Sequence, residues 1–374
     1  MIELLAEGRY DRQELITWWD QAALRSASVL VVGAGALGNE VVKNLALLGV
    51  GHLTVVDMDT VSTSNLSRCV LFREGDEGQP KALLVADRAR DLNPDVDVDA
   101  VVANVQSQGV GWIGEFDVVL GCLDNREARL WVNQACRKFH RTWIDGAIEG
   151  IRGVVKVFPP SGACYECTLG EVDRAILAQR KACSLLTSAD VELGKVPTTA
   201  TSSAVVAGLQ SQEAVRLLNG GDSPLANRGW FLIGESFDTY VVDYPEDEWC
   251  PAHEDYEGLQ RSRATRGQSL AEVIAPFRVG TEEYELGFED LIVRGGRCVE
   301  CNLGVEIGAI VTSLSPTDVE CPRCRKALGL DAVQVLSSGD ELLDRSLADL
   351  GLARFDVVTL RTPAGSQHIG FDLG

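Results

Sequence analysis

The sequence has few basic residues beside its many acids and no long apolar run. Its 374 residues include 34 Lys and Arg against 55 Asp and Glu, which gives a net charge of −21. Such an acidic chain is poorly suited to bind nucleic acid or an anionic membrane surface. No apolar stretch approaches the roughly 18 residues of a membrane span, and the N-terminal segment MIELLAEGRYDRQ has no signal-peptide profile. We therefore expect a cytoplasmic protein that binds neither nucleic acid nor membrane.

Internal repeats and low-complexity tracts are also missing, and the length allows two domains with a large core. The cysteines do not follow a disulfide pattern, because seven of the eleven stand at spacings typical of metal ligands. Cys69, Cys122 and Cys136 fall in strand, loop or helix contexts where a small buried hydrophobic residue is expected. Only Cys183 is left as a candidate reactive thiol.

The stretch from Val29 to Phe72 carries the strongest local pattern. Val29–Val32 is apolar and β-branched, as in a strand buried within a parallel sheet. Apolar residues at helical spacing then continue to Leu48, and a second strand ends at Asp57. A tight turn before a helix N-terminus binds phosphate, and an acid about 20 residues later holds ribose hydroxyls. This pattern predicts a nucleotide site, commonly that of a dehydrogenase, with a turn built from Gly33, Gly35, Ala36 and Gly38.

Three later motifs argue against a dehydrogenase. SNLSR covers residues 64–68, GQPK ends at Lys81, and CLDN begins at Cys122. A dehydrogenase does not need an arginine, a lysine and a second aspartate at its nucleotide, whereas an enzyme that cleaves the α–β bond of ATP does. Arg68 and Lys81 would offset the charge of the triphosphate, and Asp124 would hold magnesium. The sequence also offers no residues suited to a hydride-accepting pocket.

With these motifs in this order, the chain resembles the ubiquitin-activating enzyme superfamily, which includes the adenylyltransferases of sulfur-carrier proteins. The similarity begins at RYDRQ, residues 9–13, includes the helix DNREARLWVNQAC and extends to about Asp255. Strands and helices alternate over residues 29–125, which indicates a doubly wound, Rossmann-like α/β sheet. The resemblance implies that the later strands run antiparallel, so that the sheet is mixed.

The resemblance also implies roles for individual residues. Asp57 would bind ribose, Arg68 and Lys81 would contact phosphates together with Asn65, and Asp124 would coordinate magnesium. An arginine of the N-terminal arm would reach into the site of a partner subunit, so that the protein is a homodimer. The implied cofactors are ATP, Mg²⁺ and Zn²⁺. The residues implied at the ATP site are Arg12, Gly33, Gly35, Ala36, Gly38, Asp57, Asp59, Ser64, Asn65, Arg68, Lys81, Asp124 and Asn125.

Changes in composition predict how the chain is divided. The adenylation domain would begin with a helical arm over residues 9–28 and would include a cysteine-containing loop over residues 171–196. Apolar residues at helical spacing predict a helix over Asp340–Leu350. Residues 256–270 are polar and lack periodicity, as in a linker. The expected parts are an adenylation domain (residues 1–255), a linker (256–270) and a separate small domain that contains a zinc ribbon (271–374).

Two groups of residues have the spacing of tetrahedral zinc sites, so we expect two zinc ions in each chain. Two short pairs in the first domain can meet to form one site with the ligands Cys164, Cys167, Cys250 and His253. The resemblance supports this site, with His253 standing where a cysteine is more usual. Two CxxC pairs, separated by 19 residues, form a zinc ribbon with the ligands Cys298, Cys301, Cys321 and Cys324. Four thiolates leave no open coordination position, so we expect the ribbon to be structural.

The remaining thiol separates two interpretations of the activity. Cys183 lies beside Arg180 and Lys181, whose charges favour a thiolate. The resembling ubiquitin activators keep a catalytic cysteine in a loop at this place, next to a threonine, where this chain has Ser184. We therefore expect ATP-dependent adenylation of the C-terminal glycine of a ubiquitin-like protein, a thioester on Cys183 and transfer to a conjugating enzyme. The alternative is a sulfur-carrier protein adenylyltransferase that needs no thioester. A non-catalytic scaffold is disfavoured, because the arginine, lysine and aspartate motifs are all present.

Overall fold

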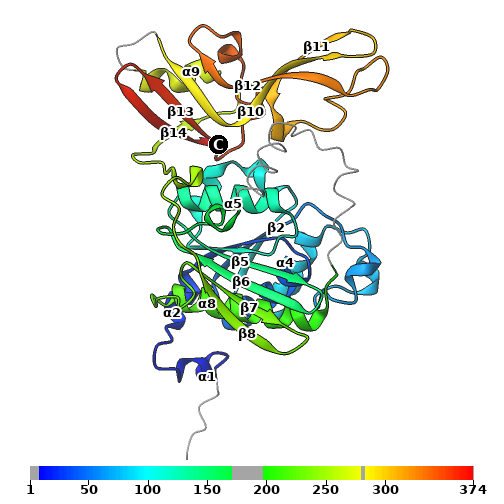
Figure 1. Cartoon of the computed structure of the whole chain (residues 1–374), viewed down its shortest axis with the longest axis vertical. Helices are drawn as coiled ribbons and strands as arrows, with labels where there is room; N and C mark the ends of the chain where they lie inside the picture. Colours follow the sequence, from blue (N-terminus) through cyan, green and yellow to red (C-terminus); the bar gives the residue numbers. More distant parts are fainter. Residues whose placement is uncertain (1–7, 171–196, 279–282, 374) are drawn as a thin grey trace, which may run out of the picture. The chain divides into compact units, whose positions relative to one another are not determined.

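The computed structural model describes residues 8–170, 197–278 and 283–373. The chain divides into two compact units, each with its own sheet and core (Figure 1). The first unit comprises the residues up to Val105 and Ile113–Asp255, and the second comprises Gln106–Trp112 and Tyr256–Gly374.

In the part of the chain that the structure describes, the first unit contains an eight-stranded sheet in the order β3-β2-β1-β4-β5-β6-β7-β8. The strands from β3 to β5 in this order run parallel, and the last three join antiparallel. The doubly wound, mixed sheet expected from the sequence is therefore confirmed. The strands are β1 Ser28–Val32, β2 His52–Val56, β3 Asp97–Val101, β4 Val118–Gly121, β5 Thr142–Glu149, β6 Arg152–Phe158, β7 Arg228–Ile233 and β8 Asp238–Asp243.

Helices cover both faces of this sheet. α3 and α8 pack against each other on one face, and α5 lies on the other (Figure 1). No helix in the described part of the chain has both the length and the apolar character that a membrane span needs. The helices are α1 Asp11–Glu14, α2 Gln21–Ser26, α3 Ala36–Leu48, α4 Lys81–Leu92, α5 Arg126–Lys138 and α8 Ala200–Leu218. Short 3₁₀ helices in the connections are η1 Thr63–Asn65, η2 Glu74–Asp76, η5 Glu166–Thr168 and η7 Pro251–His253. Two more, η3 Val105–Gln108 and η4 Val110–Glu115, contain residues of the segment Gln106–Trp112, which belongs to the second unit.

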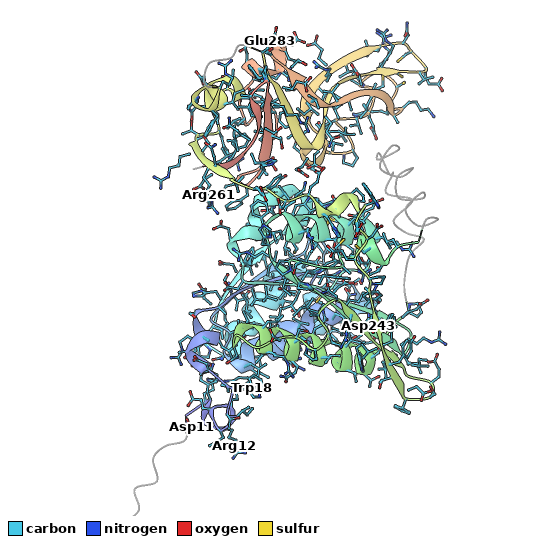
Figure 2. All side chains as sticks on the ribbon, turned by 60° about the vertical axis from the view of Figure 1, so that its left-hand side comes forward. Asp11, Arg12, Trp18, Asp243, Arg261 and Glu283 are labelled. Carbon is cyan, nitrogen blue, oxygen red and sulfur yellow. The ribbon has the colours of Figure 1, made fainter. Side chains whose placement is uncertain are left out.

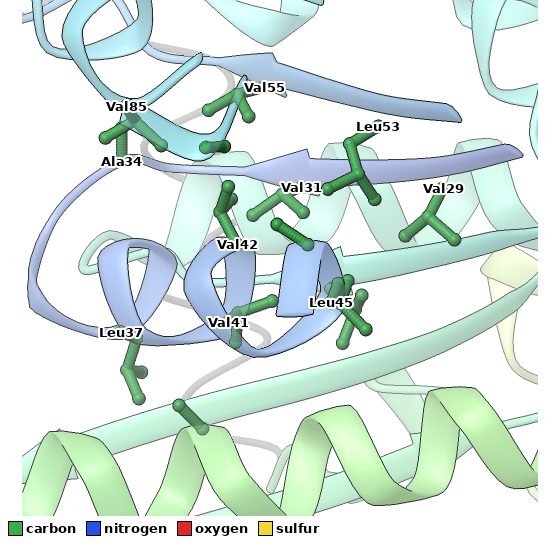
Figure 3. Close-up of a cluster of buried hydrophobic side chains, with 14 of the residues drawn as sticks. Val29, Val31, Ala34, Leu37, Val41, Val42, Leu45, Leu53, Val55 and Val85 are labelled. Carbon is green, nitrogen blue, oxygen red and sulfur yellow. The ribbon is translucent and has the colours of Figure 1, made fainter. Parts of the chain in front are cut away.

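The core between the first strands and α3 follows from the sequence. β1 reads SVLVV, and its β-branched side chains suit a strand that is buried over its last four residues. Val42 and Leu45 of α3 pack with Val31 and Val55 of the strands in one buried cluster (Figure 3). Gly49 ends the helix in the left-handed conformation, with φ at 77°. This packing fixes the N-terminus of α3 at the end of β1, where the glycine-rich turn lies.

The described residues of the second unit form a six-stranded sheet in the order β11-β10-β13-β14-β9, with β12 also paired to β10. Its core is separate from that of the first unit and includes Leu286, Ile292 and Val358. The strands are β9 Gln260–Ala264, β10 Glu285–Cys298, β11 Gly304–Ile310, β12 Leu328–Ser337, β13 Val357–Thr362 and β14 Gly365–Leu373. The helices are α9 Leu270–Ile274 and the 3₁₀ helices η8 Ala275–Phe277, η9 Val311–Ser313 and η10 Glu341–Asp344.

Two sequence predictions need correction here. Residues 256–270 are not a linker, because Gln260–Ala264 forms β9, which pairs in parallel with β14. β9 lies at the edge of the sheet and only Ala264 is buried, so the strand shows no apolar alternation. The helix predicted over residues 340–350 is also wrong, because only η10 forms there. The apolar residues that follow η10, Leu347 and Leu350, are buried in the core although their backbone is irregular. The predicted cysteine loop, with Cys183, lies outside the described residues.

Candidate active site and metal centres

The glycine-rich turn lies at the edge of the first sheet where β1, β2 and β4 end. Gly33 has φ at +101°, and a Cβ there would lie 2.5 Å from the carbonyl oxygen of Cys122 beyond β4. A Cβ on Gly38 would lie 1.9 Å from the carbonyl oxygen of Gly33. Neither position accepts a side chain. The backbone of the turn therefore packs directly against α3 on one side and against the loop that carries Asp124 on the other.

Asp57, at the end of β2, holds this turn from one side. Its Oδ2 accepts a hydrogen bond from the backbone N–H of Ala34 at 2.7 Å, and its Oδ1 accepts one from the N–H of Asp59 at 2.8 Å. Burial raises the pKa of Asp57, and the nearby Lys81 opposes that shift. The predicted ribose ligand thus also fixes the backbone that would face the phosphates.

Asn39, which the sequence analysis missed, holds the turn from the other side. Its side chain is fully buried in α3 and donates to the carbonyl oxygens of Ala34 at 2.8 Å and Gly35 at 3.0 Å. Its Oδ1 accepts from the N–H of Leu71 at 3.0 Å, just past the SNLSR motif. The only sequence signal is an amide within an otherwise apolar helix face.

The two predicted phosphate-binding cations lie near the same edge. Lys81 Nζ pairs with Asp59 Oδ2 at 2.8 Å, and Arg68 Nη1 donates to the carbonyl oxygen of Ser64 at 2.6 Å. Burial raises the pKa of the Cys69 thiol to about 11, and Arg68 and Lys81 act against this shift. Asp59 links Asp57 to Lys81, because its N–H donates to Asp57 Oδ1 at 2.8 Å and its carboxylate pairs with Lys81 at 2.8 Å. Asn39 of α3 holds the N–H of Leu71, three residues after Arg68, so the motifs that carry these residues are close in space. The structure therefore brings together residues that the sequence separates by up to 24 positions.

The SNLSR segment is shaped by its own hydrogen bonds. Asn65 is buried, and its Oδ1 accepts from the N–H of Ser62, the N-cap of η1, at 3.0 Å as part of a capping box. The Ser64 hydroxyl is exposed and lies 3.0 Å from that of Ser62. The structure thus assigns Asn65 a capping function, and its predicted phosphate contact stays a prediction.

The remaining predicted site residues lie at helix ends. Asn125 caps α5 and accepts from the N–H of Ala128 at 2.8 Å. Asp124 is exposed immediately after β4, where its carboxylate is accessible to a cation. Arg12 lies exposed on α1 in the N-terminal arm (Figure 2), and its place in a partner's site stays a prediction.

The first predicted metal group is assembled from the start of η5, η7 and the turns beside them. The Sγ atom of Cys164 lies 3.7 Å from that of Cys167 and 3.6 Å from that of Cys250, and His253 Nε2 lies 3.2 Å from the sulfur of Cys167. Ligands of a tetrahedral zinc with Zn–S bonds near 2.3 Å stand roughly 3.8 Å apart. Burial and Arg137 lower the pKa of His253, which favours the neutral, ligating ring. This donor set fits zinc.

The second predicted group lies between β10 and β12. The sulfur of Cys298 lies 3.4 Å from that of Cys324, and that of Cys301 lies 3.4 Å from that of Cys321. In each of the two groups found among the described residues, all four ligand atoms lie within 4.8 Å of one another. Backbone N–H groups lower the pKa of Cys321 to about 6, which favours the thiolate form that binds zinc. These four donors also fit zinc.

Residues 10–252 match the model of the ThiF family, and the chain therefore belongs to the ThiF family. This match confirms the resemblance to the ubiquitin-activating enzyme superfamily. The chain is 34% identical over 238 residues to the SAMP-activating enzyme E1 of Haloferax volcanii, a span of 62% of this chain and 82% of that protein. It is 33% identical over 226 residues to the molybdopterin-synthase adenylyltransferase of Escherichia coli, or 59% and 85% of the two chains.

A third relative and one solved structure extend the comparison. The sulfur carrier protein adenylyltransferase of Thermus thermophilus is 35% identical over 234 residues, which is 58% of this chain and 80% of that protein. The crystal structure of E. coli MccB with ATP superimposes with a TM-score of 0.56 at 22% identity and covers 67% of this chain and 75% of that one. At this identity the likeness shows the fold alone.

Purified full-length protein should contain about two equivalents of zinc, one for each four-ligand group. Elemental mass spectrometry should find one equivalent fewer in Cys167→Ser and likewise in Cys301→Ser. Cys136→Ser is the matched control, since Cys136 is buried outside both groups. A single equivalent in the wild type that Cys301→Ser leaves unchanged would contradict the zinc ribbon.

Glu246 should strengthen the first zinc site, because its Oε1 lies 3.6 Å from Nδ1 of His253 on the side away from the sulfurs. A carboxylate at the second ring nitrogen orients a metal-ligating histidine, and losing such a partner weakens binding about 10–100-fold. Glu246→Gln should therefore lower zinc affinity at this site by about 10-fold in chelator competition. Glu235→Gln is the control, since Glu235 pairs with the exposed Arg152. Equal affinities in the two variants would exclude this role.

Proposed function

We propose that the chain uses ATP to adenylate the C-terminal glycine of a small ubiquitin-like or sulfur-carrier protein. The observation that carries the proposal is the gathering of Asp57, Arg68 and Lys81 around the glycine-rich turn. Family membership supports it, since relatives are named as adenylyltransferases and activating enzymes. Arg68 and Lys81, together with the N-terminus of α3, can offset the negative charge of a triphosphate. Asp124 can hold the magnesium ion that cleavage of the α–β bond requires.

The reaction requires the chain to position two anions and to offset their charge. A carboxylate oxygen of the carrier attacks the α-phosphorus of ATP, the α–β bond breaks, and pyrophosphate leaves with the electron pair. The N–H groups at the start of α3 face the phosphates, and Arg68 and Lys81 stabilise the charge that develops on them. Magnesium, when bound, neutralises phosphate oxygens, and Asp124 would hold it. Most of the rate enhancement comes from positioning.

We favour the sulfur-carrier type of reaction, in which the acyl-adenylate is the product and no thioester is essential. Two of the relatives described above are named as adenylyltransferases of molybdopterin synthase or of a sulfur carrier. The second candidate adds a thioester on Cys183 and a conjugating enzyme that accepts it. The similarity to a protein named as a SAMP-activating enzyme E1 supports this candidate, as do Arg180 and Lys181 beside the thiol.

A second copy of the chain is the partner that the N-terminal arm suits. Arg12 is exposed there, and so are the apolar side chains of Leu15 and Trp18, which are 81% and 45% exposed. An arm that presents both apolar surface and a cation fits a contact between copies in which Arg12 reaches the partner's phosphates. The proposal therefore includes a homodimer.

Replacing Arg68, Lys81 or Asp124 by Ala should lower carrier-dependent ATP–pyrophosphate exchange at least 100-fold, the loss typical for one preorganised charge-stabilising group. Arg73→Ala is the matched control, because its guanidinium donates to the carbonyl oxygens of Val70 and Phe72 and takes no part in the proposed site. Exchange that survives Asp124→Ala unchanged would remove the magnesium assignment.

Cys183 decides between the two candidates. A thiolate that attacks the carbonyl carbon of the acyl-adenylate releases AMP and leaves a thioester, which an added thiol cleaves by taking over the acyl group. If the second candidate is right, ATP and carrier give a larger band on a non-reducing gel, and Cys183→Ala abolishes it while pyrophosphate exchange continues. We expect no such band from a carrier that the chain demonstrably adenylates. An adduct that an added thiol cleaves and that is lost in Cys183→Ala would overturn our preference.

A further inference from the structure

A buried aspartate in the first sheet has no part in the site described so far. Asp145 lies in the middle of β5 and is 2% exposed. It stands beside Gly121 of β4 in the parallel register and opposite Lys156 of β6 in the antiparallel one. A Cβ on Gly121 would lie 3.0 Å from Asp145 Oδ1, so the glycine leaves room for the carboxylate. An ionisable group so placed needs partners within the protein.

Its principal partner is Arg129 in the first turns of α5, which is itself 9% exposed. Arg129 Nε donates to Asp145 Oδ1 at 3.1 Å. Its Nη2 donates to the carbonyl oxygens of Leu123 at 2.5 Å and Gly146 at 3.3 Å. The guanidinium therefore ties the loop after β4 to β5. Leu123 directly precedes Asp124, so the bond fixes the peptide from which that carboxylate projects.

Lys156 completes the buried charges around Asp145. Its Nζ lies 5.3 Å from the ring centre of Tyr165 and 5.5 Å from that of Tyr244. Burial raises the pKa of Asp145, and Arg129 and Lys156 oppose the shift. Burial also lowers the pKa of Lys156, and Asp145 opposes that. Asp145 and Lys156 thus each oppose the effect of burial on the charge of the other.

The arrangement does more than fill space. A buried ion pair adds little stability compared with apolar side chains of the same volume, so stability alone does not account for it. A guanidinium is a planar fork whose donors have fixed directions, which a flexible ammonium cannot reproduce. Three acceptors surround this fork, and one of them belongs to the loop of Asp124.

We propose that Arg129, held in direction by Asp145, is a positioning residue that presents Asp124 to the magnesium of bound ATP. The inference rests on the proposed function, because it uses the magnesium role of Asp124. In this proposal neither side chain contacts the nucleotide. Their contribution is to hold the carbonyl of Leu123, and hence the following carboxylate, in the orientation that the metal needs.

The test is the gain in nucleotide affinity that magnesium provides. Calorimetry with α,β-methylene ATP, in magnesium and in EDTA, gives this gain as a ratio of two dissociation constants. Arg129→Lys keeps the charge opposite Asp145 and so preserves the fold, but it loses the fork. Arg129→Lys and the isosteric Asp145→Asn should each reduce the gain by about 10-fold or more, with affinity in EDTA unchanged.

Coupling to Asp124 separates positioning from general destabilisation. Adding Arg129→Lys to Asp124→Ala should cost no further part of the magnesium gain, because both changes remove the same contact. Glu213→Gln is the matched control, since Glu213 is a buried carboxylate paired with Arg216 on α8. It should lower the melting temperature while leaving the gain intact.

Two results overturn the proposal in different ways. An unchanged gain in Arg129→Lys, with Asp124→Ala losing it, would show that the Arg129–Asp145 pair is structural only and would leave the proposed function standing. An unchanged gain in Asp124→Ala itself would show that the magnesium assignment is wrong, and the positioning role would fail with it.

Discussion

The close approach of Gly33 to the carbonyl of Cys122 is the constraint on which the site of the first unit depends. The ends of β1 and β4 meet at one edge of the sheet because no side chain separates them. Asp57 beyond β2 and Asn39 in α3 then hold the turn by hydrogen bonds to its backbone. Motifs that lie far apart in the sequence consequently act at one place, as cleavage of a phosphoanhydride by positioning and charge requires.

Buried polar side chains connect the elements around this edge. Gln210 of α8 donates to the carbonyl oxygens of Gly121 at 3.0 Å and Ile144 at 3.2 Å. These bonds connect the end of β4 to the middle of β5, on the face of the sheet opposite to Arg129. Such groups contribute little net stability, but each satisfied hydrogen bond fixes a direction that apolar packing leaves free. We interpret them as the means by which a sheet of apolar strands holds polar loops in register for the reaction.

The sequence predicted the parts of this arrangement that repeat or come in motifs. β1 and α3 carry clear periodicity, and the two zinc groups carry ligand spacing, so both were predictable. Asn39 and Asp145 were not, because one polar residue within an apolar element gives no periodic signal and its partners come from distant segments. β9 escaped because an edge strand with most side chains exposed lacks apolar alternation. The apolar residues near Leu347 have helical spacing and were predicted to form a helix. They are buried in the core, but the backbone that carries them is irregular.

The central claim is that the chain breaks the α–β bond of ATP and leaves AMP on a carrier protein. The most direct measurement follows radioactive phosphate after incubation of enzyme, carrier and ATP labelled at either the α or the γ position. The account predicts that the α-label becomes attached to the carrier through its C-terminal carboxylate and that the γ-label is released as pyrophosphate. Transfer of the γ-label to the carrier, or its release as inorganic phosphate without pyrophosphate, would contradict the account.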